Sequence, residues 1–218
     1  MLILLGKTLS VMDVQIKHLE KKQLNDYLII IRPHAELLNK IIQVKQVFAD
    51  KFKNENALYI KPHLALVKFS QFAMAEERIV NKLKALSMGL TPVKIELKDF
   101  GNYPSHTMFV NVTSKIQIEI LVKSIRINMQ QLMRADKDNK PYFIMQPNFN
   151  IGQKLLPWQF EKAWLEYSHR QFTGRFIVDE MLLLRRKNDE RKYFIVERFQ
   201  LKNMPVSTTQ GTLFNCAI

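Results

Sequence analysis

The sequence predicts an α+β protein in which two similar lobes face each other across a groove. Segments with the apolar pattern of strands alternate with segments of helical spacing along the 218 residues. A short pattern also occurs twice, and each copy precedes a helix and two strands. The copies are Pro62-His63-Leu64-Ala65-Leu66 and Pro147-Asn148-Phe149-Asn150-Ile151. A unit repeated once usually forms two lobes related by pseudo-symmetry, although so short a pattern also arises by coincidence.

Apolar spacing and punctuation residues mark the elements of the first half. Pro33 closes the first strand-like run, and Gly89 follows the second helical run. The predicted elements are a strand at Asp26–Arg32, a helix at Ala35–Phe52, a strand at Ala57–Phe69 and a helix at Ala75–Leu86.

Turn signals divide the second half in the same way. Gly101 to Pro104 separates two strands, residues 134–140 form a polar loop, and Pro157 opens a helix at its first turn. The predicted elements are strands at Val93–Phe100, Thr107–Val112 and Tyr142–Gly152, helices at Lys115–Met133 and Trp158–Tyr167, and a hairpin of Phe176–Leu184 and Tyr193–Leu201. The expected organisation is an N-terminal extension (1–25), one bilobal domain (26–202) and a Ser/Thr-rich C-terminal tail (203–218).

The charge balance indicates an anionic partner. Lysine and arginine number 33 against 20 aspartates and glutamates, which gives a net charge of +13. Such an excess attracts polyanions, of which nucleic acid is the commonest. The alternative is that the charge serves general solubility.

Cysteine content and apolar runs indicate the compartment. Cys216 is the single cysteine, so an internal disulfide is excluded. A chain without disulfides is suited to a reducing compartment. The apolar start, Met1 to Leu5, is shorter than the ~7–15 residues of a secretory signal. No run approaches the ~20 apolar residues of a membrane span. We expect a cytoplasmic protein without a membrane partner.

Strand parity places the polar residues of each repeat on one face. His63 and Ala65 are two apart, as are Asn148 and Asn150, so each pair shares a side of its strand. Two amides on one face must find hydrogen-bond partners if they are buried, or else line a wet cavity. Satisfied core amides and a ligand site are equally good interpretations of Asn148 and Asn150, and a lone strand histidine is more often structural than catalytic.

The order of elements and the two repeats resemble the two-histidine phosphoesterase superfamily, and within it the bacterial 2′–5′ RNA ligase-like branch. The resemblance covers roughly Asp26 to Leu201 and is carried by the two repeats and by the stretches 141–154, 156–163 and 172–176. It implies two lobes, each an antiparallel-rich sheet with helices outside, around a central groove. The family's mark is a His-hydrophobic-Thr/Ser-hydrophobic tetrad in each lobe.

The resemblance also implies a chemistry that this chain matches only in part. In the family the two histidines act as general base and general acid, and the two hydroxyls hold the phosphate. The reaction opens a 2′,3′-cyclic phosphate or joins RNA ends through a 2′–5′ bond. Here His63 is kept, but Ala65 replaces a hydroxyl, Asn148 replaces the second histidine and Asn150 replaces the second hydroxyl.

These departures predict binding without efficient turnover. An asparagine amide cannot exchange a proton near neutrality, and losing a general acid or base typically lowers the rate by ~10²–10⁴. The expected function is therefore recognition of an RNA end or nucleotide phosphate, with His63 as the remaining acid/base position.

Two alternatives stay open. One is an active cyclic phosphodiesterase or ligase in which His63 works with a water or with His106. The other is a protein-interaction scaffold with a vestigial groove.

Further ligand-binding candidates are basic or aromatic residues near the repeats. Lys61 shares the strand face of His63 by parity, which makes it the best phosphate-positioning candidate. Weaker candidates are Lys68, Lys154, Arg175 and a rim position of His106, with Tyr103 and Trp158 as stacking partners for a base. The alternative for each is that it is solvent-exposed or packs in the structure and contacts no ligand. No zinc-ligand spacing and no Gly-rich phosphate loop occurs, so we expect neither metal nor cofactor.

Overall fold

The computed structural model describes residues 23–104, 106–188 and 190–204. The predicted N-terminal extension up to residue 22 and the tail beyond residue 204, with Cys216, lie outside the described residues. The described α-helices are α2 (Ala35–Phe52), α3 (Glu76–Gly89), α4 (Lys115–Met133) and α5 (Pro157–Tyr167), with 3-10 turns at Glu55–Ala57 and Ala73–Ala75. The described strands are β1 (Leu24–Ile31), β2 (Leu64–Phe72), β3 (Val93–Tyr103), β4 (Thr107–Val112), β5 (Tyr142–Phe143), β6 (Phe149–Gln153), β7 (Thr173–Val178), β8 (Glu180–Arg186) and β9 (Phe194–Gln200).

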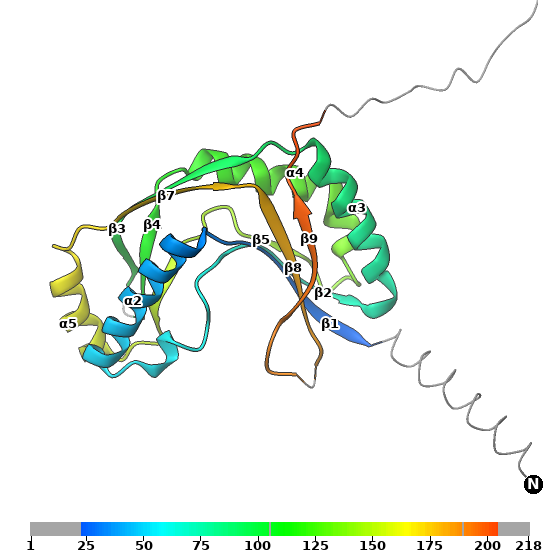
Figure 1. Cartoon of the computed structure of the whole chain (residues 1–218). Coiled ribbons are helices and arrows are strands. Elements are labelled where there is room, and N and C mark those ends of the chain that lie inside the picture. The colour runs from blue at the N-terminus through cyan, green and yellow to red at the C-terminus, as the bar shows by residue number, and fades with distance from the viewer. Residues whose placement is uncertain (1–22, 105, 189, 205–218) are drawn as a thin grey trace, which may run out of the picture.

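The strands form two antiparallel sheets, which confirms the predicted α+β class. One sheet has five strands in the order β5-β2-β1-β8-β9, and the other has four in the order β6-β4-β3-β7. Figure 1 shows the strands following an arch, with α2 and α5 at one end and α3 at the other. Helix α2 packs on β6 and β7, whereas α3 packs on β9 and α4 on β2 and β3. Each sheet therefore has helices packed against it, and α4 contacts both sheets.

Helix α2 shows how the sequence sets these elements. His34 caps its start, where the ring Nδ1 accepts a hydrogen bond from the Leu37 N–H at 3.4 Å. The chain leaves the helix through Lys53, whose φ of 53° is left-handed. The face that packs on the sheets recurs every three or four residues and consists of Leu37, Ile41, Lys45, Phe48 and Phe52. Lys45 is the one charged residue of this buried stripe.

Three predicted strands differ from the observed ones. The run predicted at Ala57–Phe69 begins only at Leu64, because a 3-10 turn and an irregular segment precede it. The run predicted at Tyr142–Gly152 is two strands, β5 and β6, and each belongs to a different sheet. The run predicted at Phe176–Leu184 likewise divides at Asp179, where β7 ends in one sheet and β8 begins in the other. The hairpin is therefore β8 with β9.

Candidate functional site

A cavity of about 470 Å³ lies where the two repeats meet. His63 and Ala65 line it from the first repeat, and Asn148 and Asn150 line it from the second. The lysines at 61 and 68 also face it. The cavity's remaining lining residues are Lys45, Ile60, Pro62, Tyr103, Ile144, Gln146, Pro147 and Gln153. Most of the predicted site residues are thus brought to one place.

The two repeats hold equivalent positions relative to their strands, although β2 is an inner strand of its sheet and β6 an edge strand. His63 stands immediately before β2, and Asn148 stands immediately before β6. Burial follows the predicted parity in both copies. His63, Ala65, Asn148 and Asn150 are half-buried, while the alternate residues Leu64, Leu66, Phe149 and Ile151 are fully buried. The apolar side of each strand anchors it in the core, and its polar side is left to the cavity.

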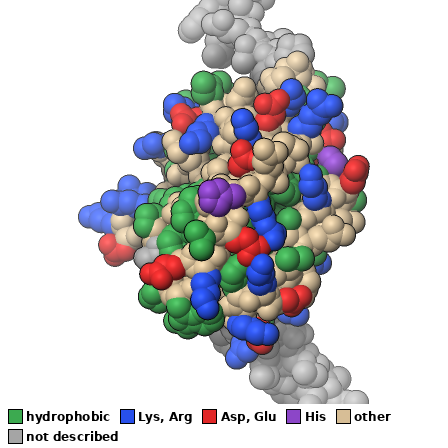
Figure 2. Space-filling view, turned by 90° about the vertical axis from the view of Figure 1, so that its left-hand side faces the viewer, with side chains coloured by type: hydrophobic (Ala, Val, Ile, Leu, Met, Phe, Trp, Pro, Cys, Tyr) green, Lys and Arg blue, Asp and Glu red, His purple; other side chains and the backbone are tan. Residues whose placement is uncertain are grey.

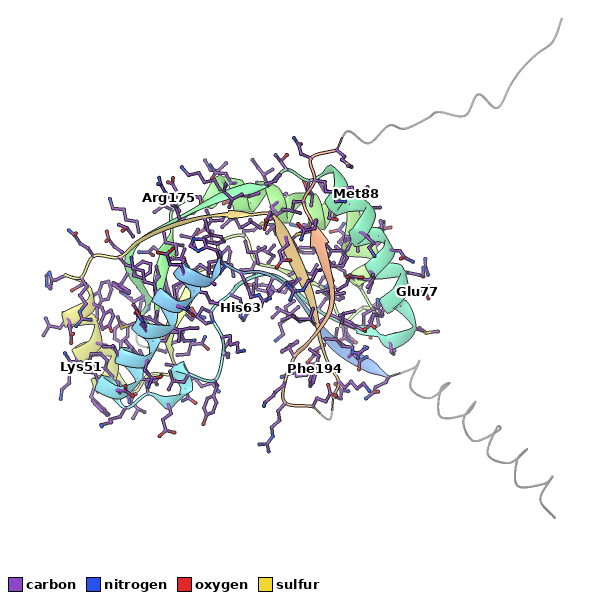
Figure 3. The ribbon with its side chains drawn as sticks, in the orientation of Figure 1. Lys51, His63, Glu77, Met88, Arg175 and Phe194 are labelled. Carbon is purple, nitrogen blue, oxygen red and sulfur yellow. The ribbon has the colours of Figure 1, made fainter. Side chains whose placement is uncertain are left out.

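The start of β2 is open because its neighbour is short. β5 pairs with β2 only at Val67 and Lys68, and the Ile144 N–H donates to the Leu66 carbonyl just beyond. No strand of the described residues pairs with this edge at His63. Figure 3 shows His63 where the segment after α2 enters the sheet, near the middle of the molecule.

The His63 ring is held in one tautomer. Its Nδ1 lies 2.9 Å from the Lys61 carbonyl oxygen, and a carbonyl can only accept, so Nδ1 carries the proton of the neutral ring. The unprotonated nitrogen is then Nε2. Burial lowers the pKa of His63, and the positive charges of Lys45 and Arg32 lower it further, against the opposing effect of the Lys61 carbonyl. The ring is therefore neutral at pH 7 and can accept a proton.

The Asn148 amide is engaged at both ends. Its Nδ2 donates to the Tyr103 hydroxyl at 3.3 Å, and its Oδ1 accepts from the Val112 N–H at 3.3 Å. The Val112 N–H needs such a partner because the β4–β6 pairing ends at Val110 and Phe149. Asn148 can hold neighbours in place but cannot move a proton. By contrast, the Asn150 amide makes no hydrogen bond with the described residues.

Lys45 is a cavity residue that the sequence analysis missed. The residue is only 5% exposed, and its Nζ donates to the Ile60 carbonyl. Burial lowers its pKa from 10.5 to about 8. The available signal was a lysine on the apolar stripe of α2, four residues after Ile41 and three before Phe48. Such a position ordinarily takes an apolar residue.

Several predicted candidates lie elsewhere. His106 and Lys154 do not line the cavity, and both are exposed. His106 has its Nδ1 2.8 Å from the Pro104 carbonyl oxygen. Trp158 is also outside the cavity and lies beneath the Lys162 ammonium, 5.6 Å from its ring centre. Arg175 lines other depressions beside β7 and lies apart from His63 in Figure 3.

The charge of the cavity differs from that of the face around α2 and α5. Among the described residues that line it are three lysines and no carboxylate. Figure 2 shows a different pattern on the face around α2 and α5, where lysine and arginine side chains are intermixed with acidic and apolar ones.

No group of three metal-ligating side chains occurs in the described part of the chain. Nor does any described helix have the length and apolarity to cross a membrane.

A family model described as the 2′-5′ RNA ligase superfamily matches residues 33–190. The chain belongs to the 2′–5′ RNA ligase superfamily. The match spans both repeats, so the predicted family resemblance is confirmed. No match was found among curated protein sequences.

Solved structures share the fold of this superfamily member at low identity. TT0787 of Thermus thermophilus is similar with a TM-score of 0.57 and 15% identity, over 81% of this chain and 98% of that one. LigT of E. coli complexed with 3′-AMP is similar with a TM-score of 0.57 and 14% identity, over 82% and 98%. LigT of E. coli complexed with NADP+ is similar with a TM-score of 0.57 and 16% identity, over 83% of this chain and 99% of that one. These likenesses support the bilobal, antiparallel fold.

Proposed function

We propose that this member of the 2′–5′ RNA ligase superfamily binds an RNA end or a nucleotide through its phosphate, in the cavity between the repeats, and turns it over weakly or not at all. The observation that carries the proposal is that His63 and Asn148 line the same cavity. One of the two can accept a proton, while the other has its amide engaged with Tyr103 and Val112.

The lining of the cavity supports an anionic ligand. Three lysines face it without a carboxylate among the described lining residues, so a negative charge placed there is attracted from several sides. Asn150 can donate its amide hydrogens to a phosphate oxygen in place of the missing hydroxyl. Tyr103 lines the same cavity, is 46% exposed and packs on Phe109, which leaves part of its ring for a base. The structures of LigT with 3′-AMP and with phosphate are consistent with this ligand class.

The active alternative would have to use a partner other than Asn148. His106 lies outside the cavity, which argues against the pairing of His63 with His106. A water is then the remaining partner for His63. A single general base of this kind leaves the leaving group without an acid, which supports slow turnover.

The test combines binding with turnover. We expect isothermal titration of adenosine 2′,3′-cyclic phosphate to show binding that weakens with added salt. We expect the same ligand to be hydrolysed slowly, at a rate little above that of a His63→Ala preparation or equal to it. Rapid hydrolysis that disappears in His63→Ala would favour the active enzyme. Absence of any binding at low salt would exclude the proposal and favour the scaffold.

A further inference from the structure

Lys45 is a buried charge at a position built for an apolar side chain. It occupies the stripe of α2 between Ile41 and Phe48, which are both fully buried. Removing an ammonium from water is strongly unfavourable unless the charge is compensated. A lysine at such a site therefore requires a partner.

The described residues give the Lys45 ammonium a hydrogen-bond acceptor but no negative charge. The ammonium has three N–H donors, and the Ile60 carbonyl takes one of them. None of the ion pairs formed among the described residues includes Lys45. A carbonyl provides a dipole but no negative charge. Lys45 lines the cavity, and no carboxylate among the described lining residues compensates its charge.

We propose that Lys45 is the residue that pairs with the bound phosphate in this cavity, in place of the hydroxyl absent at Ala65 and alongside the Asn150 amide. This inference rests on the proposed function and deepens it, because it names the cation that holds the ligand. The hydrogen bond to the Ile60 carbonyl fixes the Nζ beside the segment that leads to His63, so the phosphate lies within reach of both side chains.

The site also links binding to protonation. The pKa of Lys45 is about 8 in the ligand-free protein, so its ammonium loses its proton in mildly alkaline solution. A phosphate beside it favours the charged form and raises that pKa. Binding near pH 8 then takes up a proton from solvent. The affinity is greatest below pH 8 and falls as the pH rises through that value.

Other charged groups around the cavity do not imitate this behaviour. Lys61 precedes β2, Lys68 lies on β2 and Arg32 follows β1; the two lysines are exposed. His63 has a lowered pKa and is neutral throughout the alkaline range. Helix α2 itself contributes Lys45 alone to the lining, and β6 and the segment before it contribute amides.

The experiment is isothermal titration of the full chain with adenosine 2′,3′-cyclic phosphate at pH 7 and pH 9. Neither the phosphodiester nor the base of this ligand titrates in that range. We expect the wild-type dissociation constant to rise about tenfold, because the protonated fraction of a group with a pKa of about 8 falls about tenfold over that interval. In two buffers of different ionisation enthalpy at pH 8, we expect the uptake of about half a proton.

Three variants complete the design. Lys45→Met keeps the aliphatic stem, and we expect it to bind at least about tenfold more weakly at pH 7 and without dependence on pH. Lys45→Arg keeps a charge that does not titrate, and it should retain binding at pH 9. Lys51→Met is the matched control, since it removes an exposed lysine of the same helix; its affinity should follow the wild type. Circular dichroism and melting curves verify folding.

Each outcome decides a specific point. Wild-type binding that Lys45→Met leaves unchanged, or weakens no more than Lys51→Met does, overturns this inference while the proposed function stands. Wild-type binding without proton uptake at pH 8 overturns it as well, even if the variants fail to fold. A wild-type protein that does not bind at pH 7 overturns the proposed function and this inference together.

Discussion

His63 and Asn148 line one cavity from two different sheets, each at the residue just before its strand begins. The backbone groups beside them require opposite hydrogen-bond roles of the two side chains. His63 donates from Nδ1 to a carbonyl, whereas Asn148 accepts a backbone N–H at Oδ1. A histidine at position 148 whose Nδ1 accepted the Val112 N–H would present a protonated Nε2 to the cavity. The backbone around position 148 therefore suits a general acid, although the residue there is an amide.

Restoring that acid should create activity. We expect the triple variant Ala65→Thr, Asn148→His, Asn150→Thr to hydrolyse a 2′,3′-cyclic phosphate ~10²–10⁴ faster than the wild type, because it regains an acid and two phosphate-holding hydroxyls. Chromatographic product analysis measures the rate. Adding His63→Ala to this background should remove the gain. A folded triple variant with no gain would contradict the equivalence of positions 63 and 148.

Asn148 should also matter for stability. Asn148→Ala leaves the Val112 N–H and the Tyr103 hydroxyl without their partner, so we expect the free energy of unfolding to fall by about 1–2 kcal/mol. Urea denaturation followed by circular dichroism gives the value. Asn128→Ala is the control, because that amide lies on the exposed face of α4 and should change stability by no more than about 0.5 kcal/mol. Equal losses in the two variants would exclude a structural role for the Asn148 amide.

Lys45 should lower the stability of the ligand-free protein. Its pKa is about 8 when folded and 10.5 as a free side chain, so the unfolded state binds more protons between these values and stability rises with pH there. We expect Lys45→Met to be about 1–2 kcal/mol more stable than the wild type at pH 7, after allowance for the unpaired Ile60 carbonyl. The difference should shrink as the pH approaches 10.5. Urea titrations at pH 7 and 10 measure it, and a difference independent of pH would contradict the burial of the charge.

His63 should make the protein less stable in acid. Its pKa is lowered from 6.5 on folding, so below that value the unfolded state takes up a proton that the native ring resists. Stability is then lost as the pH falls through about 6.5 and the loss is complete below the lowered pKa. His63→Gln removes this titration, so the gap in melting temperature between the two proteins should change between pH 7.5 and pH 5.5. A constant gap would show that His63 titrates normally.

The contact between α2 and β6 should fix the second repeat. A Cβ at Gly152 would collide with the Phe48 ring, which is fully buried. We expect Gly152→Ala to lower the free energy of unfolding by about 1–3 kcal/mol, as overpacking of a core does. Pairing it with Phe48→Leu should recover part of the loss. If Gly152→Ala is neutral in urea denaturation, β6 is not held against α2 as described.

Local patterns determined much of this fold. The spacing of apolar residues set α2 and α4 at their observed bounds, and Thr107–Val112 is the observed β4. Parity within each repeat correctly gave the buried and half-buried sides of β2 and β6. Side chains two apart share a face in any extended strand, so this result needs no knowledge of the rest of the chain. Membership of the superfamily was equally visible in the sequence, since it rests on element order and the two repeats.

Only the tertiary structure decided which elements meet. The divisions at residues 144–148 and at Asp179 send continuous apolar runs into two sheets, because pairing depends on hydrogen-bond partners far away in the sequence. The same long-range packing buries Lys45 beside His63 and leaves His106 and Lys154 outside the cavity. A lysine looks alike in sequence whether its ammonium is solvated or enclosed. Its environment, and hence its charge, is set by the segments that fold over it.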